Sequence, residues 1–138
     1  MPTIISPRPP LNLFDAKHML IDSTIRPILT TPKYQVPAVG PNQVRNIQAV
    51  ALLTSLIVTN DTANTISVFL EIRNADNTAF NLLTGLPVPA NDFALIELSK
   101  QNLPSDESLW IRTSAGQSGV AHLSYVLNQR EEYEDLTV

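Results

Sequence analysis

The sequence predicts an all-β protein, an antiparallel, jelly-roll-like β-sandwich of about six to eight strands with an extended proline-rich N-terminal arm. Two observations support this fold class. From about residue 44 onward, short apolar or alternating runs are separated by turn residues about every ten positions, a spacing typical of sandwiches and barrels. Eight of the eleven prolines lie in the first 41 residues, where they disfavour helices and central strands.

Proline content, strand-like patterns and charge divide the chain into three regions: an arm over residues 1–43, a sandwich domain over residues 44–128 and an acidic tail over residues 129–138. The arm holds four basic and two acidic side chains, whereas the sandwich domain and the tail each carry a net charge of −3. The arm is also rich in apolar residues, which would be costly to leave in water. We therefore expect it to pack on its own domain or to reach a neighbouring subunit.

Six strands are expected within the sandwich domain, at Ala49–Asn60, Thr65–Arg73, Thr78–Leu83, Phe93–Leu98, Ser108–Thr113 and Val120–Leu127. The clearest of them is Thr65–Arg73, because apolar residues at every second position predict one buried face. Gly116 and Gly119 precede the last strand, and we expect both to supply positive φ angles in the turn before it.

The stretch GLPVPANDFALIEL, Gly85–Leu98, is predicted to be a corner rather than a linker or a binding loop. Strand-like runs lie on both sides of it, and a chain of this length has no second core to link. Pro87 and Pro89 lack the N–H that a central strand needs, so we expect them at a sheet edge or in the crossing segment. Asn91 and Asp92 then supply turn chemistry before the next strand.

Composition favours protein partners over several other classes. Charged residues make up 16% of the chain, below the roughly 25% of a typical soluble domain, and such a surface suits contact with other proteins. The net charge of −4 and the absence of a Lys/Arg cluster argue against nucleic acid. The N-terminus lacks the pattern of a secretory signal, and no window is apolar enough for a membrane span. We expect the protein in a cytoplasm or in a larger assembly made there.

No catalytic, metal or cofactor site is expected. Cysteine is absent, and His18 and His122 lie in different regions with no second ligand at a suitable spacing. Ser124 shares a predicted strand face with His122, but two neighbours on one strand do not make a triad, and no Gly-x-Ser-x-Gly elbow is present. The four glycines are too scattered for a phosphate-binding loop.

Trp110, the only tryptophan, lies in an alternating strand. The alternation places Leu109 and Ile111 on one face and Trp110 and Arg112 on the other. We expect a core position for the Trp first, and an interface anchor as the alternative, because Trp and Arg are enriched at binding hot spots. Phe69 lies on the polar face of its own strand, and an exposed Phe there suggests that something, such as the arm, covers that face.

Several segments together resemble a known group of proteins. The order VPAVGPNQ, ALLTSLIVTNDTANTISVFLEIR, FNLLTGLPVPANDFALIEL and LPSDESLWIRTSAGQSGVAHLSYVL resembles the small all-β virion proteins of tailed bacteriophages. The resemblance covers residues 36–127 and not the first 35, and it rests on turns and strands rather than on catalytic residues. It implies a virion component, in a capsid decoration, neck or tail role.

The resemblance and the composition predict a non-enzymatic virion structural protein, assembled in the host cytoplasm. The first expectation is a capsid decoration (cement) protein that forms homo-oligomers, such as a trimer, and clamps other virion proteins such as the major capsid protein through its arm. The alternatives are a head–tail neck or tail ring protein and a carbohydrate-binding adhesion module. No nucleic acid, membrane or cofactor is expected as a partner. The expected interface residues are Arg8, Leu13, Phe14, Met19, Ile21, Ile25, Ile28, Tyr34, Trp110 and Arg112.

Overall fold

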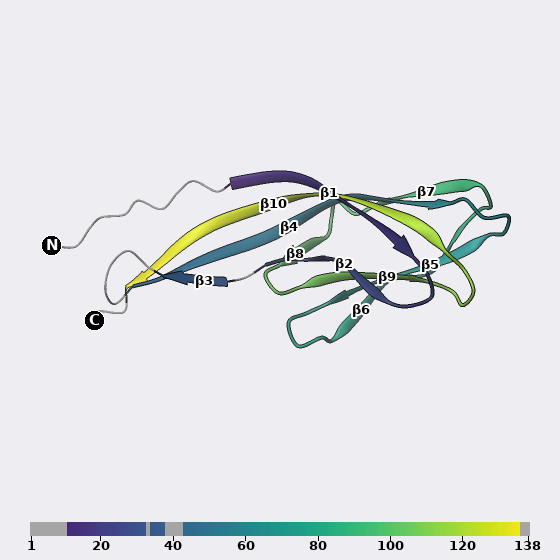
Figure 1. The fold of residues 1–138 in the computed structure, drawn as a ribbon. Helices are drawn as coiled ribbons and strands as arrows, with labels where there is room; N and C mark the ends of the chain where they lie inside the picture. The colour runs from purple at the N-terminus through teal and green to yellow at the C-terminus, as the bar shows by residue number, and fades with distance from the viewer. Residues whose placement is uncertain (1–10, 33, 38–42, 136–138) are drawn as a thin grey trace.

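The computed structural model describes residues 11–32, 34–37 and 43–135 and forms an antiparallel β-sandwich of two sheets (Figure 1). Its strands are β1 (Leu11–Ile21), β2 (Arg26–Thr30), β3 (Tyr34–Pro37), β4 (Gln43–Asn60), β5 (Ile66–Arg73), β6 (Ala79–Val88), β7 (Asp92–Glu97), β8 (Asn102–Pro104), β9 (Ser108–Thr113) and β10 (Gly119–Asp135). No helix in this part of the chain is long and apolar enough to cross a membrane.

The first sheet, sheet A, has the order β1-β10-β4-β3, and β7 and β8 also pair with β4. The second, sheet B, has the order β2-β9-β5-β6. At 18 residues β4 is long enough to pair with β10 along one side and with β3, β8 and β7 in succession along the other. The outer parts of β4 and β10, with β3, continue as a ribbon beyond the sandwich (Figure 1).

The strand order confirms the jelly-roll-like sandwich that the sequence predicts. Without the short strands β3 and β8, eight strands remain, and the first pairs with the last, β1 with β10. The second pairs with the second last, β2 with β9, and the inner pairs are β4 with β7 and β5 with β6. This nested pairing is a long hairpin rolled into two packed sheets, which is the jelly-roll arrangement.

The hydrophobic core lies between the two sheets and is built from every second residue of their strands. Its fully buried large side chains include Leu53, Leu56, Val58, Ile66, Val68, Leu70, Val88, Leu103, Leu109, Ile111 and Leu123. Burial of each large aliphatic side chain contributes about 1.5–3 kcal/mol. In β4 the inward positions change parity between Leu53 and Leu56, because a β-bulge opposite Ser124 and Tyr125 inserts one extra residue.

The strand and corner predictions within the sandwich domain are confirmed, with shifted ends. β5 buries Ile66, Val68 and Leu70 on one face, as the alternating pattern predicts. The predicted corner carries the chain from β6, an edge strand of sheet B, to β7 of sheet A. Asn91 adopts a positive φ of 53° in the turn between them. Only one of the two glycine predictions is correct, because Gly116 has a φ of 75° whereas Gly119 does not adopt a positive φ.

The structure changes the predicted division into arm, domain and tail. Residues 11–31, assigned to the arm, supply β1 and β2, which pair with the last two long strands of the chain. Prolines are compatible with this because β2 is an edge strand, and its pairing with β9 is irregular directly after Pro27. The tail boundary at residue 128 also falls inside an element, because β10 continues to Asp135. Residues 1–10 and 38–42 of the predicted arm lie outside the described residues.

Candidate interaction faces

The outer face of sheet A is built by alternate residues of β1, β10, β4 and β7, which the strand registers align in rows. One row holds His18, His122, Ile57 and Leu95, and the next holds Leu20, Val120, Thr59 and Phe93. The row on the other side holds Ala16, Ser124, Ser55 and Glu97. Half of these twelve side chains are apolar, and they share a surface four strands wide, which is about 14 Å across, with two histidines and four other polar residues.

Several of these apolar side chains are strongly exposed. The exposed fractions are 84% for Phe14, 74% for Leu20, 60% for Leu95 and 59% for Phe93. We call the outer side of sheet A around these four residues the apolar face. Several large exposed apolar side chains on one face of a sheet are a feature of contact sites more than of an ordinary soluble surface. The apolar face therefore has the chemistry of a protein contact surface.

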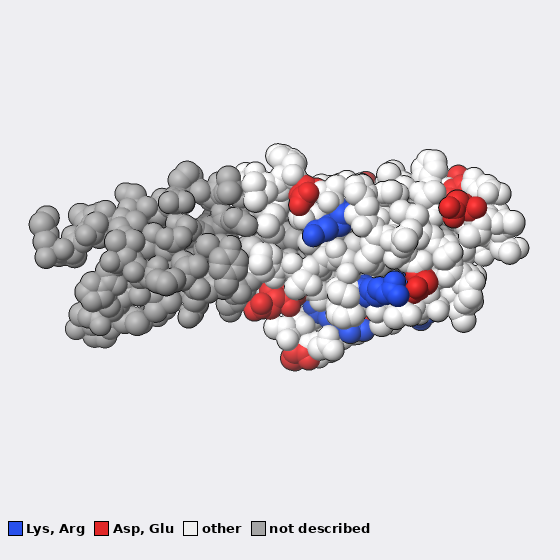
Figure 2. Space-filling view, viewed as in Figure 1, with Lys and Arg blue, Asp and Glu red and all other residues white. Residues whose placement is uncertain are grey.

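Charge is sparse on the described surface. Figure 2 shows Lys, Arg, Asp and Glu atoms singly or in small groups, with most of the surface between them uncharged. Where opposite charges meet, as at Asp22 and Arg26 with 3.2 Å between Oδ2 and Nη2, the pair is half-exposed. In this view no basic patch of the kind that binds phosphates stands out on the described residues.

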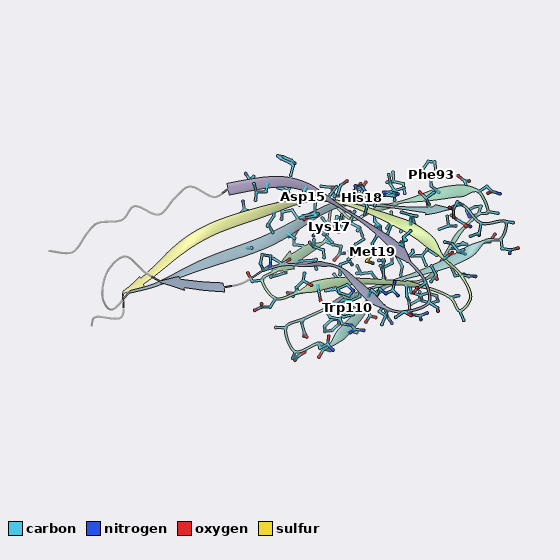
Figure 3. All side chains as sticks on the ribbon, in the orientation of Figure 1. Asp15, Lys17, His18, Met19, Phe93 and Trp110 are labelled. Carbon is cyan, nitrogen blue, oxygen red and sulfur yellow. The ribbon has the colours of Figure 1, made fainter. Side chains whose placement is uncertain are left out.

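The two histidines, which the sequence places in different regions, meet on the apolar face. His18 and His122 are directly opposite each other on β1 and β10, and their Nδ1 atoms are 2.7 Å apart. The rings meet edge to face, with an interplanar angle of 67° and centroids 4.9 Å apart. At this distance one ring donates its N–H and the other accepts with its lone pair, which requires two different tautomers. Figure 3 places His18 and Phe93 on the sheet A layer and Trp110 on the sheet B layer.

The outer face of sheet B carries a ladder of cations stacked on aromatic rings. The guanidinium carbon of Arg73 lies 3.9 Å from the centre of the Trp110 ring, and that of Arg112 lies 3.9 Å from the centre of the Phe69 ring. Glu71 pairs with Arg73 at 3.4 Å. The expected face of Trp110 is confirmed, but its expected core position is wrong, because the ring is half-buried under Arg73 on the outside of the sheet. The ring of Phe69 is covered by Arg112 of the neighbouring strand β9, a side chain of the same face.

A small cavity of about 170 Å³ lies beside this ladder, lined by residues that include Ile25, Phe69, Asn81 and Arg112. Sites for small-molecule ligands usually have volumes of about 300–1,000 Å³. The cavity is therefore too small for a sugar or a cofactor. Two of its lining residues, Phe69 and Arg112, are already stacked on each other, so we interpret this face as a structural ladder.

A wider hollow of about 430 Å³ lies at the end of the sandwich, where the turn after β4 meets the turn before β7. Asn60, Asp61, Asn91, Asp92 and Phe93 line it. The side chain of Asn60 fixes this end of the fold, because its Nδ2 donates to three backbone carbonyl oxygens at 2.7–3.0 Å. The hollow combines carboxylates and amides with one exposed aromatic ring.

The expected interface residues of β1 and β2 fall into different environments. Phe14 is on the apolar face, and Leu13 is 41% exposed on the other side of the strand. Met19 is partly buried against the core, and Ile25 is half-buried at the small cavity. Of these four, only the two early residues of β1 are exposed enough for a large contact.

Two of the expected interface residues are corrected by the structure. Ile21 and Ile28 are 3% and 5% exposed and belong to the hydrophobic core, because their strands turn these side chains toward the opposite sheet. Arg8 lies outside the described residues. For Tyr34 the structure describes the backbone, which pairs in β3 with Ile47 of β4.

Comparisons with family models and with curated proteins identify no relative. No protein-family model matches the chain, and no curated protein is similar to it. Among the described residues, no group of three or more potential metal ligands converges. The candidate faces are therefore interpreted from their own geometry and chemistry.

Proposed function

We propose that this protein is a non-enzymatic structural component of a tailed-bacteriophage virion, a capsid decoration protein that assembles with its own copies and with other capsid proteins. The observation that carries the proposal is the exposed apolar face of sheet A. Two analogies support it: jelly rolls occur in viral capsid domains, and residues 36–127 resemble small virion proteins. The role in capsid decoration is inferred from the resemblance, and the apolar face is inferred to be the contact surface from its geometry.

The apolar face supports assembly because water removed from its exposed rings and aliphatic chains stabilises a contact by roughly 25 cal/mol per Å². Specific interfaces bury about 800 Å² on each partner, and the strongly exposed side chains of Phe14 and Leu20 would contribute apolar area to such a contact. Many copies on a lattice then add avidity to a modest single contact. Because residues 11–31 belong to the sandwich, the contact proposed here uses this face instead of a detached arm.

The double variant Phe93→Ser/Leu95→Ser tests the proposal. The matched control is Phe80→Ser, because Phe80 is also exposed, at 56%, but belongs to edge strand β6 of sheet B. We expect light scattering to give an oligomer for the wild type and for the control, and a monomer for the double variant. A monomeric wild type, or an oligomer that survives the double variant, would contradict the proposal.

Copy number on purified particles tests the position in the virion. A decoration protein occupies repeated sites over the whole shell, so quantitative mass spectrometry should find copies in proportion to the major capsid protein. A neck or tail ring closes at one vertex and contains on the order of six or twelve copies. A ring-like number would replace decoration by the neck or tail role, and absence from particles would refute both.

A second candidate function, glycan binding for adhesion, is favoured by the hollow at the end of the sandwich. Its Asp61, Asp92 and exposed Phe93 combine hydrogen-bonding oxygens with an aromatic ring, and jelly rolls also occur in lectins. A glycan array with the wild type and with Asp61→Asn tests this function without altering the apolar face. Binding that is lost in the variant would support the adhesion role, and an array without hits would exclude it for the glycans tested.

A further inference from the structure

We propose that His18 and His122 form a two-imidazole binding site for a divalent transition metal ion of the class of Zn²⁺ or Cu²⁺. The proposal rests on their geometry and does not require the virion role, and because the pair lies on the apolar face, the assembly contact proposed above would cover it. The sequence contains two histidines and no cysteine, so this pair is the only imidazole or thiolate set in the chain. The structure places both members at one point on the surface.

The backbone holds the two side chains in position before any ligand arrives. β1 and β10 pair without interruption through eleven positions, from Leu11 opposite Gln129 to Ile21 opposite Gly119. His18 and His122 lie within this ladder as directly opposite residues, whose side chains leave the sheet on the same face. Because strands in a paired sheet do not shift register freely, little conformational entropy is lost when both rings bind one ion.

The observed distance is close to that of a chelate. An ion 2.0–2.1 Å from each nitrogen, with a tetrahedral angle between them, requires the two Nδ1 atoms to be about 3.3 Å apart. They are 2.7 Å apart with a hydrogen bond between them, so a rotation of the rings that separates the atoms by about 0.6 Å suffices. In the donor ring the proton moves from Nδ1 to Nε2 by exchange with solvent. Both rings remain neutral, and both Nδ1 lone pairs then face the ion.

The surroundings select the kind of ion. The nearest outward residues on β1, β10 and β4 are Ala16, Leu20, Ile57, Val120 and Ser124, whereas Glu97, in an adjacent row, lies on β7 and is separated from His122 by strand β4. None of these five carries a charge that would repel a cation, and none offers a carboxylate. Nitrogen ligands without carboxylates favour Cu²⁺, Ni²⁺ and Zn²⁺ over Mg²⁺ and Ca²⁺, which prefer oxygen. Water completes the coordination shell on the solvent side, because His18 is exposed.

Calorimetric titration of the full chain with ZnCl₂ tests the site. We expect one ion per chain, with binding weakened by roughly tenfold or more in either His18→Gln or His122→Gln, because a chelate loses one of its two linked ligands. The matched control is Lys17→Gln, a neighbouring β1 residue on the other side of the strand, which should bind as the wild type does. Thermal unfolding of each variant verifies that the sandwich is intact.

Nitrogen NMR of the imidazoles provides a second readout. Zinc should shift the Nδ1 signals of both rings and leave the Nε2 atoms protonated. Absence of zinc binding, binding retained in both single variants, coordination through Nε2, or equally tight binding of MgCl₂ would each overturn the proposal. The titration repeated on Phe93→Ser/Leu95→Ser separates this result from the assembly role, because that variant keeps both histidines.

Discussion

The phenolic oxygen of Tyr125 lies 3.0 Å from Oδ2 of Asp15, the residue directly opposite it on β1. Tyr125 is 5% exposed and donates its O–H to the carboxylate, which also accepts the N–H of Ala16 at 2.8 Å. The bond from Ala16 and then that from Tyr125 lower the pKa of Asp15 below 3.8. Burial and the bond to Asp15 raise the pKa of Tyr125 to about 12.

This pair predicts a loss of stability at alkaline pH. The unfolded chain releases the Tyr125 proton near pH 10 and the folded chain near pH 12, so its contribution is complete below pH 10 and is lost as pH rises toward 12. Tyr125→Phe should lower the free energy of unfolding by about 1 kcal/mol at pH 8 and flatten its decrease above pH 10. Urea unfolding of both proteins between pH 8 and pH 11.5 measures this. Equal slopes would show that folding does not raise the pKa of Tyr125.

Substitution of the single side chain of Asn60 should strongly lower the free energy of unfolding. Its buried amide donates to the carbonyl oxygens of Asn64, Val88 and Pro89, which ties the end of β4 to the corner after β6. Asn60→Ala leaves these oxygens unpaired and should destabilise the fold by about 2–4 kcal/mol. Asn60→Asp should cost more at neutral pH, because a carboxylate cannot donate to them.

The matched control for Asn60 is Asn81→Ala, a substitution of the same type at an exposed position on β6. It should change the free energy of unfolding by less than about 0.5 kcal/mol. Denaturant unfolding monitored by Trp110 fluorescence compares the variants. Similar losses at both positions would contradict the role assigned to the buried amide.

Substitution of Gly119 and of Gly116 should destabilise the fold for two different reasons. A Cβ at Gly119 would lie 2.9 Å from the carbonyl oxygen of Thr59 and 3.1 Å from Cδ1 of Ile66, so Gly119→Ala should cost about 1–3 kcal/mol. At Gly116 the space is open but φ is +75°, so Ala should cost about 1 kcal/mol. Asn tolerates this φ and should recover stability only at Gly116. Thermal unfolding of the four variants would refute this distinction if Asn behaved alike at both sites.

The ladder on sheet B predicts that two similar ion pairs differ in strength. Arg73 and Glu71 have side chains 18% and 16% exposed, and Arg73 also stacks on Trp110. Arg73→Gln should therefore cost about 1–2 kcal/mol. Arg26→Gln breaks a pair with Asp22 whose side chains are 46% and 44% exposed, and it should cost less than about 0.5 kcal/mol. Urea unfolding at low and high salt compares them, and equal losses would contradict a contribution from stacking.

The buried and exposed faces of individual strands could be predicted because apolar and polar residues alternate within the sequence of each strand. Leu109 and Ile111 are buried while Trp110 and Arg112 lie outside, as their alternation indicates. The role of Trp110 could not be derived in the same way. Whether an outward ring is covered depends on Arg73, which belongs to a different strand.

Strand β1 was not predicted, because the high proline content of the first 41 residues as a whole argued against strands there. Residues 11–26 contain no proline, which is the local signal that the regional count obscures. The pattern of β1 is also inverted at its start, because the exposed Phe14 is apolar whereas Asp15 and Lys17 point to the inner side. Alternation alone therefore does not reveal which face of this strand packs on the core.

The histidine pair depends on information that no local pattern contains. His18 and His122 are separated by 104 positions, and they meet only if the first strand pairs with the last in one particular register. A shift of one residue would move one ring to the opposite face of the sheet. The pairing of first and last strands follows from a jelly roll, but the register follows from packing of the complete core.

The nested order of the strand pairs has a consequence for biosynthesis. The β5–β6 hairpin closes the shortest loop, so it can form while later residues are still inside the ribosome. The first long strand to be synthesised, β1, must wait for residues 119–129 before its partner exists. Until then its backbone donors and acceptors lack hydrogen-bond partners in the sheet, and its inward side chains lack a core to pack against. We expect folding to be slow, with chaperones engaging the nascent chain mainly through this waiting strand.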